Sequence, residues 1–149
     1  MFDLNIFMDY RSLLGEVIGI GSNRTVHRHL NNNDFVIKVQ RPKTLKKNKV
    51  LNNIMEWSIW EQYSNTKYEK LFCPCIEISE DGIYLIQRYA KVLSPGKHLK
   101  RSRSQWNQLP SLIKNYPDSR WYNNWGMLED RYVIIDYGRE NADRVRKGF

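Results

Sequence analysis

The chain has 149 residues, of which 41% are hydrophobic and 27% are charged, which is enough for one domain with a packed core and excludes an intrinsically disordered protein. No apolar run reaches membrane-spanning length, and the N-terminus carries Asp3 and Asp9 without a basic lead, so we expect no membrane contact, no secretory signal and a cytoplasmic location. The formal charge of +8 favours an anionic partner, which could be a nucleotide, a nucleic acid or an acidic protein.

The positive charge is concentrated in three segments, residues 41–49, 97–103 and 139–147. Each segment suits an anion-binding surface, and each also suits an ordinary solvated surface. The sequence alone leaves both interpretations open.

The cysteines and histidines give no recognisable metal-binding pattern. Only Pro74 separates Cys73 from Cys75, and that spacing is too tight for the usual paired zinc ligands. The three histidines do not complete a ligand set. We therefore interpret the two cysteines as structural thiols.

The first part of the chain predicts a short helix followed by three strands. Residues 1–14 have a partial apolar face at helical spacing. Residues 17–28 are typical of a strand, a glycine turn and a second strand, and the turn signal of residues 31–34 precedes a third strand over 35–40. This order predicts an antiparallel meander.

A helix and two further strands follow. Residues 71–78 and 82–89 predict two strands joined by a turn over 79–82. Together with the meander they predict a five-stranded antiparallel sheet with one helix. That helix is predicted over residues 48–63, because apolar residues recur there at spacings of three and four: Val50, Leu51, Ile54, Trp57 and Trp60.

The last part of the chain is less regular. Residues 91–101 form a basic connection, and residues 102–115 predict a helix that Pro110 limits. Residues 132–135 form an apolar β-type run that delivers Asp136 to its end. Taken alone, this region is also explained by a β-hairpin with a polar turn.

Three segments carry residues suited to phosphate chemistry. The turn around Gly19 and Gly21 lets backbone N–H groups approach a phosphate, although a plain hairpin turn has the same composition. Lys38 lies in an apolar strand, where it either points to solvent or is held by a carboxylate. Glu56, 18 residues later, is the first candidate for that carboxylate, and Glu61 is the second.

Oxygen-bearing side chains later in the chain suit a divalent cation. Asp136 ends a buried strand and is followed closely by a glycine, so its carboxylate can hold a hard cation over a cleft. Asp118 and Asn123 are five residues apart and add carboxylate and amide oxygens. The sequence therefore suggests a site for phosphate and Mg²⁺.

The order of these pieces resembles the protein kinase-like fold over about residues 15–138. Gly19 and Gly21, with Val26 after them, resemble the glycine-rich loop that covers the nucleotide phosphates. Arg24 stands in place of the third glycine of that loop.

Two strands and the helix match further parts of the family. Residues 36–38 are similar to the strand that carries the phosphate-pairing lysine, and Glu56 matches the helix glutamate that holds this lysine. Residues 85–89 resemble the strand that runs into the adenine-binding hinge. The resemblance implies that Gln87 lies at the nucleotide.

The later motifs supply the remaining parts. Asp118 with Asn123 resembles the catalytic loop, and residues 136–138 resemble the metal-binding D-F-G motif. Residues 124–126 are also similar to small kinase-like proteins encoded by bacteriophages. In that alignment Asn124, and not Asn123, would bind the metal together with Asp136.

The resemblance implies a single α+β domain with a protein kinase-like N-lobe over residues 1–90 and a much reduced C-lobe over residues 91–149. It also implies ATP and Mg²⁺ as cofactors and phosphoryl transfer to a protein or a small molecule, with Lys38 and Asp118 as catalytic residues. Two alternatives stay open. One is a catalytically inactive kinase-like binding protein of the phage type that blocks an acidic host factor in the host cytoplasm, and the other is a basic nucleic-acid-binding domain.

Overall fold

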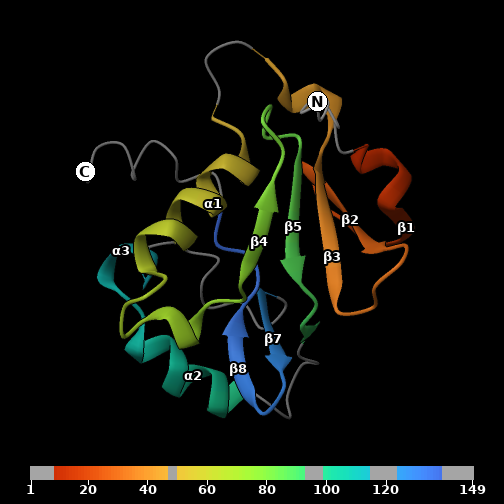
Figure 1. The fold of residues 1–149 in the computed structure, drawn as a ribbon. Coiled ribbons are helices and arrows are strands. Elements are labelled where there is room, and N and C mark those ends of the chain that lie inside the picture. Colours follow the sequence, from red (N-terminus) through yellow and green to blue (C-terminus); the bar gives the residue numbers. More distant parts are fainter. Residues whose placement is uncertain (1–8, 47–49, 93–98, 115–123, 139–149) are drawn as a thin grey trace, which may run out of the picture.

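The computed structural model of the chain describes residues 9–46, 50–92, 99–114 and 124–138. The five-stranded sheet fills the upper part of Figure 1, and the later strands and helices lie below it. Most of the helix expected over residues 1–14 lies outside the described residues. The part inside them is a short 3-10 helix, Tyr10–Leu13, which passes directly into the first strand.

The larger sheet has the predicted five strands, and every neighbouring pair is antiparallel. The strand order is β1-β2-β3-β5-β4, so that β3 lies at the centre. The bounds are β1 Leu14–Ile20, β2 Arg24–His29, β3 Phe35–Gln40, β4 Cys75–Ile78 and β5 Tyr84–Arg88. The predicted strand over 71–78 is shorter than expected, because Glu69–Leu71 forms a 3-10 turn.

Side chains and one glycine shape the turns of this sheet. The Asn32 side chain accepts a hydrogen bond from the Asp34 amide at 2.9 Å, which closes the β2–β3 turn. In the β4–β5 turn the Asp81 carboxylate accepts from Ser79 Oγ at 2.6 Å and from the Ile83 amide at 3.0 Å. Gly82 adopts a φ of +77° there, a conformation that favours glycine.

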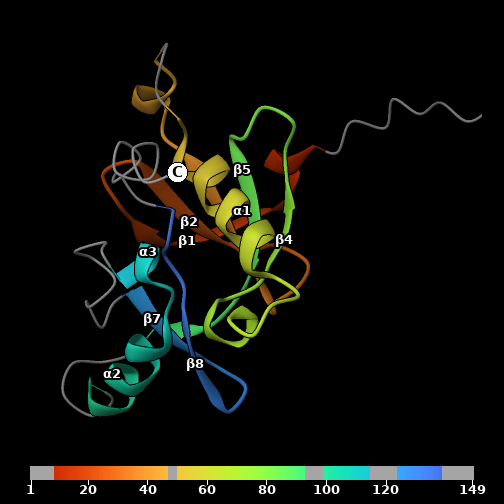
Figure 2. The same ribbon diagram turned by 90° about the vertical axis from the view of Figure 1, so that its left-hand side faces the viewer.

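The helix α1, Asn52–Tyr63, packs against β3, β4 and β5 (Figures 1 and 2). The Gln40 side chain accepts a hydrogen bond from the Asn53 amide at 2.9 Å, which satisfies one of the unpaired donors at the helix start. The apolar face predicted for this helix is only partly correct, because Trp57 and Trp60 pack against the core and Val50 and Ile54 do not. Ile54 and Val50 are exposed and the two tryptophans are only half-buried. The buried face combines apolar and polar side chains: Asn53, Met55, Glu56, Ile59 and Tyr63.

A second sheet of three strands has the order β6-β7-β8, with β6 Lys91–Val92, β7 Trp125–Leu128 and β8 Arg131–Ile134. It was predicted only in part: the β-type run expected over residues 132–135 corresponds to β8, and the alternative of a β-hairpin corresponds to its pairing with β7. β6 falls in the segment expected to be only a connection. The hairpin between β7 and β8 turns at Glu129–Asp130, where Glu129 adopts a φ of +56°.

Two helices accompany the second sheet. The helix predicted over 102–115 is divided into α2, Leu99–Gln108, and α3, Ser111–Lys114, with Pro110 between them. Proline has no amide hydrogen, so it interrupts the helix as expected. Among the described residues, neither helix nor α1 is long and apolar enough to cross a bilayer.

The segment before β4 is one of the places where the two sheets are joined. Phe72 forms a parallel bridge with Ile134 of β8, and the Cys73 amide donates to the Ile134 carbonyl at 2.9 Å. The hydroxyl of Tyr137 donates to the Cys73 carbonyl at 2.8 Å. One cluster of buried side chains therefore draws on both sheets and on α1, including Ile59, Phe72, Leu85, Trp125, Ile134 and Tyr137.

The two cysteines lie in this core as free thiols, as predicted. The Cys73 thiol donates to the Arg88 carbonyl at 3.1 Å, and Cys75 Sγ lies 3.1 Å from the Tyr137 hydroxyl. Burial raises the pKa of the Cys73 thiol to about 12 and also raises the pKa of Cys75. Both thiols are therefore protonated at neutral pH.

Candidate functional site

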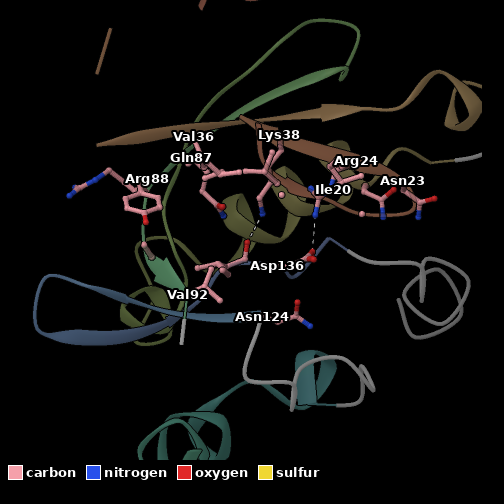
Figure 3. A pocket seen from close by; sticks show the side chains of 18 of the residues that line it. Ile20, Asn23, Arg24, Val36, Lys38, Gln87, Arg88, Val92, Asn124 and Asp136 are labelled. Carbon is pink, nitrogen blue, oxygen red and sulfur yellow. Dashed lines mark hydrogen bonds and ion pairs between the residues drawn. The ribbon is translucent and has the colours of Figure 1, made fainter. Parts of the chain in front are cut away.

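A cavity of about 330 Å³ lies between the two sheets, under the β1–β2 turn (Figure 3). This volume is in the range of small-ligand sites. Its lining comes from the β1–β2 turn, from β3, from the end of β5 and from the segments beside β7 and β8. The lining includes seven residues that the sequence analysis proposed for the site: Gly19, Gly21, Val26, Lys38, Gln87, Asn124 and Asp136.

One end of the cavity has apolar walls. Ile18 and Val26 come from the β1–β2 hairpin and Val36 from β3. Val92 of β6 and Ile135 after β8 come from the opposite side. Aliphatic side chains facing one another across a slot suit a flat, largely apolar ring.

The lysine and the glutamate predicted from the sequence are in direct contact. Lys38 Nζ lies 2.8 Å from Glu56 Oε1, and it also donates to the Ile135 carbonyl. Lys38 is 5% exposed and Glu56 is fully buried. β3 is a central strand and α1 covers it, so the alternative of a solvated edge lysine does not apply. Glu61, the second candidate, is exposed on the helix surface.

Arg24 joins this pair and was not predicted to do so. It begins β2, directly after the glycine turn, and its guanidinium points into the cavity toward Asp136 (Figure 3). Arg24 Nη1 contacts the second oxygen of Glu56, and Nη2 lies 2.7 Å from Asp136 Oδ1. Burial alone would lower the pKa of Arg24, but the carboxylates of Glu56 and Asp136 outweigh it and raise that pKa above its usual value.

Asn53 supports the arginine from behind. Its side-chain Oδ1 accepts a hydrogen bond from Arg24 Nη1 at 3.1 Å. Its side-chain Nδ2 donates to the carbonyls of Lys38 at 3.0 Å and Ile83 at 2.9 Å. The side chain is fully buried. A polar residue inside the helix–sheet contact is therefore satisfied by hydrogen bonds, and these bonds fix Arg24 and α1 relative to β3.

Asp136 reaches the cavity because the chain after β8 is anchored on both sides. The Ile135 amide donates to the Asn124 carbonyl at 2.7 Å, and the Gly138 carbonyl accepts from Asn52 Nδ2 at 2.8 Å. A side chain at Gly138 would collide with Glu56, since a Cβ there would lie 2.5 Å from Glu56 Cβ. The glycine therefore lets this segment approach α1 closely.

The remaining predicted residues divide into two groups. Asn124 is 4% exposed and lines the cavity with Asp136. Asp118 and Asn123 lie outside the described residues. The assignment of either Asn123 or Asn124 as a metal ligand therefore stays a prediction.

The carboxylates at the cavity are engaged by cationic side chains. Among the described residues, no three His, Cys, Asp or Glu side chains gather as a metal-binding group. The Asp136 carboxylate is in an ion pair with Arg24, and Glu56 holds both Lys38 and Arg24. A cation such as Mg²⁺ prefers several carboxylate and water oxygens, and a guanidinium stands beside Asp136, the one carboxylate among the described residues of the lining.

Sequence reasoning missed Arg24 and Asn53 as parts of the site. One signal for Arg24 was available, since this arginine replaces a glycine in a loop that otherwise fits the family pattern. No such signal was available for Asn53, because the sequence gives no indication that an asparagine within a helix will be buried. A search of protein-family models and a search of curated proteins found no match for this chain.

Proposed function

We propose that the protein binds ATP in the cavity between its two sheets, as a nucleotide-binding domain of the protein kinase-like type. The observation that carries the proposal is the contact between Lys38 and Glu56 at the wall of a cavity that also contains Asp136 and the glycine turn. A lysine held by a buried glutamate is positioned to pair with phosphate oxygens.

Each part of the cavity has a role in this proposal. The apolar walls around Val26, Val36 and Val92 hold the adenine ring, with Gln87 at the same end. Gly19 has no side chain above the cavity, and a Cβ there would make only ordinary contact with the Val26 side chain at 3.5 Å. The phosphates can therefore lie close to the turn, within reach of the Lys38 ammonium.

Phosphoryl transfer is the second candidate function. It is favoured by Asp136 and Asn124, which line the same cavity as Lys38. In this candidate Asp118 accepts the proton of the acceptor hydroxyl and Lys38 neutralises charge on the transferred phosphate. The resemblance to kinases would add Mg²⁺, held by Asp136 with Asn123 or Asn124, but the Arg24–Asp136 ion pair does not fit that ion as the side chains stand.

A thermal-shift titration tests nucleotide binding. We expect ATP to raise the melting temperature, because ligand at a hundredfold excess over its Kd stabilises the native state by about 2.7 kcal/mol. Lys38→Met should remove most of this shift, and Lys43→Met is the control, since Lys43 is exposed and does not line the cavity. The absence of a shift with ATP both in EDTA and in Mg²⁺ would refute the proposal.

A turnover assay separates an enzyme from a binding protein. If the protein transfers phosphate, Lys38→Ala and Asp136→Ala should abolish consumption of the γ-phosphate of ATP while circular dichroism shows folded variants. Turnover that is unchanged in both variants would rule out these roles. Binding of ATP without any turnover in the wild-type protein would identify a kinase-like binding protein instead.

A further inference from the structure

The position of Arg24 is the feature of the cavity that the proposed function leaves unexplained. A guanidinium that contacts Glu56 and Asp136 stands beside the carboxylate to which the kinase resemblance assigns the metal. It is 8% exposed, lines the cavity and is fixed by Asn53. Arg24 is therefore a built part of the site and not a surface residue that happens to lie near it.

Within the described part of the chain, the four charged side chains that contact one another at Arg24 carry no net charge. Lys38 and Arg24 carry two positive charges, and Glu56 and Asp136 carry two negative charges. Buried charges are tolerated when they are paired in this way. A divalent cation at Asp136 would place a third cationic centre next to Arg24 and would have to break the Arg24–Asp136 ion pair.

The side chains that line the cavity nevertheless favour an anion. Among the described lining residues, Arg24, Lys38 and Arg88 are positively charged and Asp136 is negatively charged. Glu56 does not line the cavity and sits behind Lys38 and Arg24. A polyphosphate therefore meets two cations whose positions are set by the same buried carboxylate.

The guanidinium also retains donors for a ligand. Its contacts within the described part of the structure are those with Asn53, Glu56 and Asp136, and they use three of its five N–H groups. Planar guanidinium groups bind phosphate oxygens through paired hydrogen bonds, which a lysine cannot do. Arg24 can accordingly hold Asp136 and a phosphate at the same time.

We propose that Arg24 takes the place of the divalent cation, so that this site binds nucleoside di- and triphosphates without a metal ion. The proposal rests on the proposed function, because it concerns the same cavity. Asp136 then orients Arg24 instead of binding a metal, and the phosphates lie between Arg24 and Lys38. Adenosine monophosphate binds more weakly, since its single phosphate brings less negative charge to the two cations.

Isothermal titration calorimetry with ATP, ADP and AMP in EDTA and in Mg²⁺ tests the proposal. For the wild-type protein we expect ATP and ADP to bind in EDTA with a Kd within about threefold of the value in Mg²⁺. Arg24→Gln should raise the Kd for ATP in EDTA by roughly 10- to 100-fold, the loss expected when hydrogen bonds to a charged group are removed.

Two further variants control this experiment. Arg11→Gln makes the same chemical change at an exposed arginine of the 3-10 helix, outside the cavity lining, and should leave the Kd unchanged. Arg24→Gly restores the third glycine of the loop and releases Asp136, so its ATP binding should become stronger in Mg²⁺ than in EDTA. Arg24→Lys keeps the positive charge but not the paired hydrogen bonds, and it takes the place of the other Arg24 variants in the titration if they do not fold.

The outcomes separate this inference from the proposed function. Wild-type protein that binds ATP only in Mg²⁺ overturns the metal-independent site and leaves nucleotide binding intact. Binding in EDTA that Arg24→Gln does not weaken also overturns it. Wild-type protein that binds no nucleotide under either condition refutes the proposed function itself.

Discussion

Glu56 is the residue on which the arrangement of the cavity depends. Each of its oxygens contacts a different cation, Lys38 on one side and Arg24 on the other, and the Tyr137 amide lies 3.3 Å from Oε1. The side chain is fully buried, so water cannot replace a lost partner. Removal of this carboxylate takes away the ion pair of Lys38 and leaves Arg24 paired with Asp136 alone.

The replacement Glu56→Gln should therefore be strongly destabilising. Breaking a buried ion pair by removing one partner costs about 3–5 kcal/mol, and urea denaturation measures that loss. Glu61→Gln in the same helix is the matched control, because Glu61 is exposed and should change the free energy of unfolding by less than about 0.5 kcal/mol. Equal effects of the two substitutions would contradict the role of Glu56.

A second prediction at the scale of single residues concerns Gly138. A Cβ there would lie 2.5 Å from Glu56 Cβ and 2.8 Å from the Glu56 amide nitrogen, so Gly138→Ala must displace the backbone. Overpacking of this kind costs about 1–3 kcal/mol. Gly19→Ala is the comparison, since its nearest contact would be an ordinary 3.5 Å, and it should leave the thermal midpoint nearly unchanged.

The sequence predicted individual residues of the site unevenly. Lys38 and Glu56 were found because their types, order and spacing match a known pattern, and the structure places them in contact. Arg24 was noted only as a departure from that pattern. Its role depends on two carboxylates that are 32 and 112 residues away in the chain, and no local rule connects residues so distant.

At the scale of elements, α1 shows where local patterns fail. Spacing of apolar residues predicted a face with Val50, Ile54 and Trp57, but the buried face includes Asn53 and Glu56 instead. The polar pair is stable there because its hydrogen bonds and ion pairs are complete. The strands of the larger sheet were easier to predict, since turn residues and β-branched runs mark their ends locally.

Asn53 tests this account of α1. Asn53→Ala removes the hydrogen bonds to the Lys38 and Ile83 carbonyls and to Arg24, and each buried group left unpaired costs about 1–3 kcal/mol. Chemical denaturation should show a large loss of stability. Ser58→Ala on the exposed side of the same helix should cost far less, and a similar loss there would argue against the buried network.

Within the second sheet, β6 was missed for a physical reason. β6 has only two residues, Lys91 and Val92, and both are exposed, so it carries no hydrophobic alternation. Its strand conformation comes from pairing with Met127 and Gly126 of β7. Such a strand is determined by its partner and cannot be predicted from its own sequence.

At the scale of the whole molecule, the buried thiols report on global opening. Cys73 and Cys75 lie in the core that joins both sheets, and burial raises the pKa of Cys73 to about 12. A thiol reagent at pH 8 should therefore react with native protein far more slowly than with protein in urea, because only the exposed thiolate is nucleophilic. Rapid reaction of both thiols in the native protein would show that the core is not closed.

The same shift in pKa makes the stability of the protein depend on pH. An unfolded cysteine has a pKa of about 8.5, and in the native state the pKa of Cys73 is about 12. The native state holds its proton more tightly, so this contribution to stability is present below about pH 8.5 and declines as the pH rises toward 12. Denaturation midpoints measured from pH 7 to pH 10 should fall less in Cys73→Ala than in the wild-type protein.

The bridge between Phe72 and Ile134 also limits how the two sheets can move apart. Rotation of one sheet away from the other would break that bridge and the Cys73 bond and would expose the side chains packed around Tyr137. Gly21 and Ser22 of the β1–β2 turn, in contrast, are exposed and add nothing to the core. This turn can therefore bend without opening the core, whereas the two sheets cannot separate without doing so.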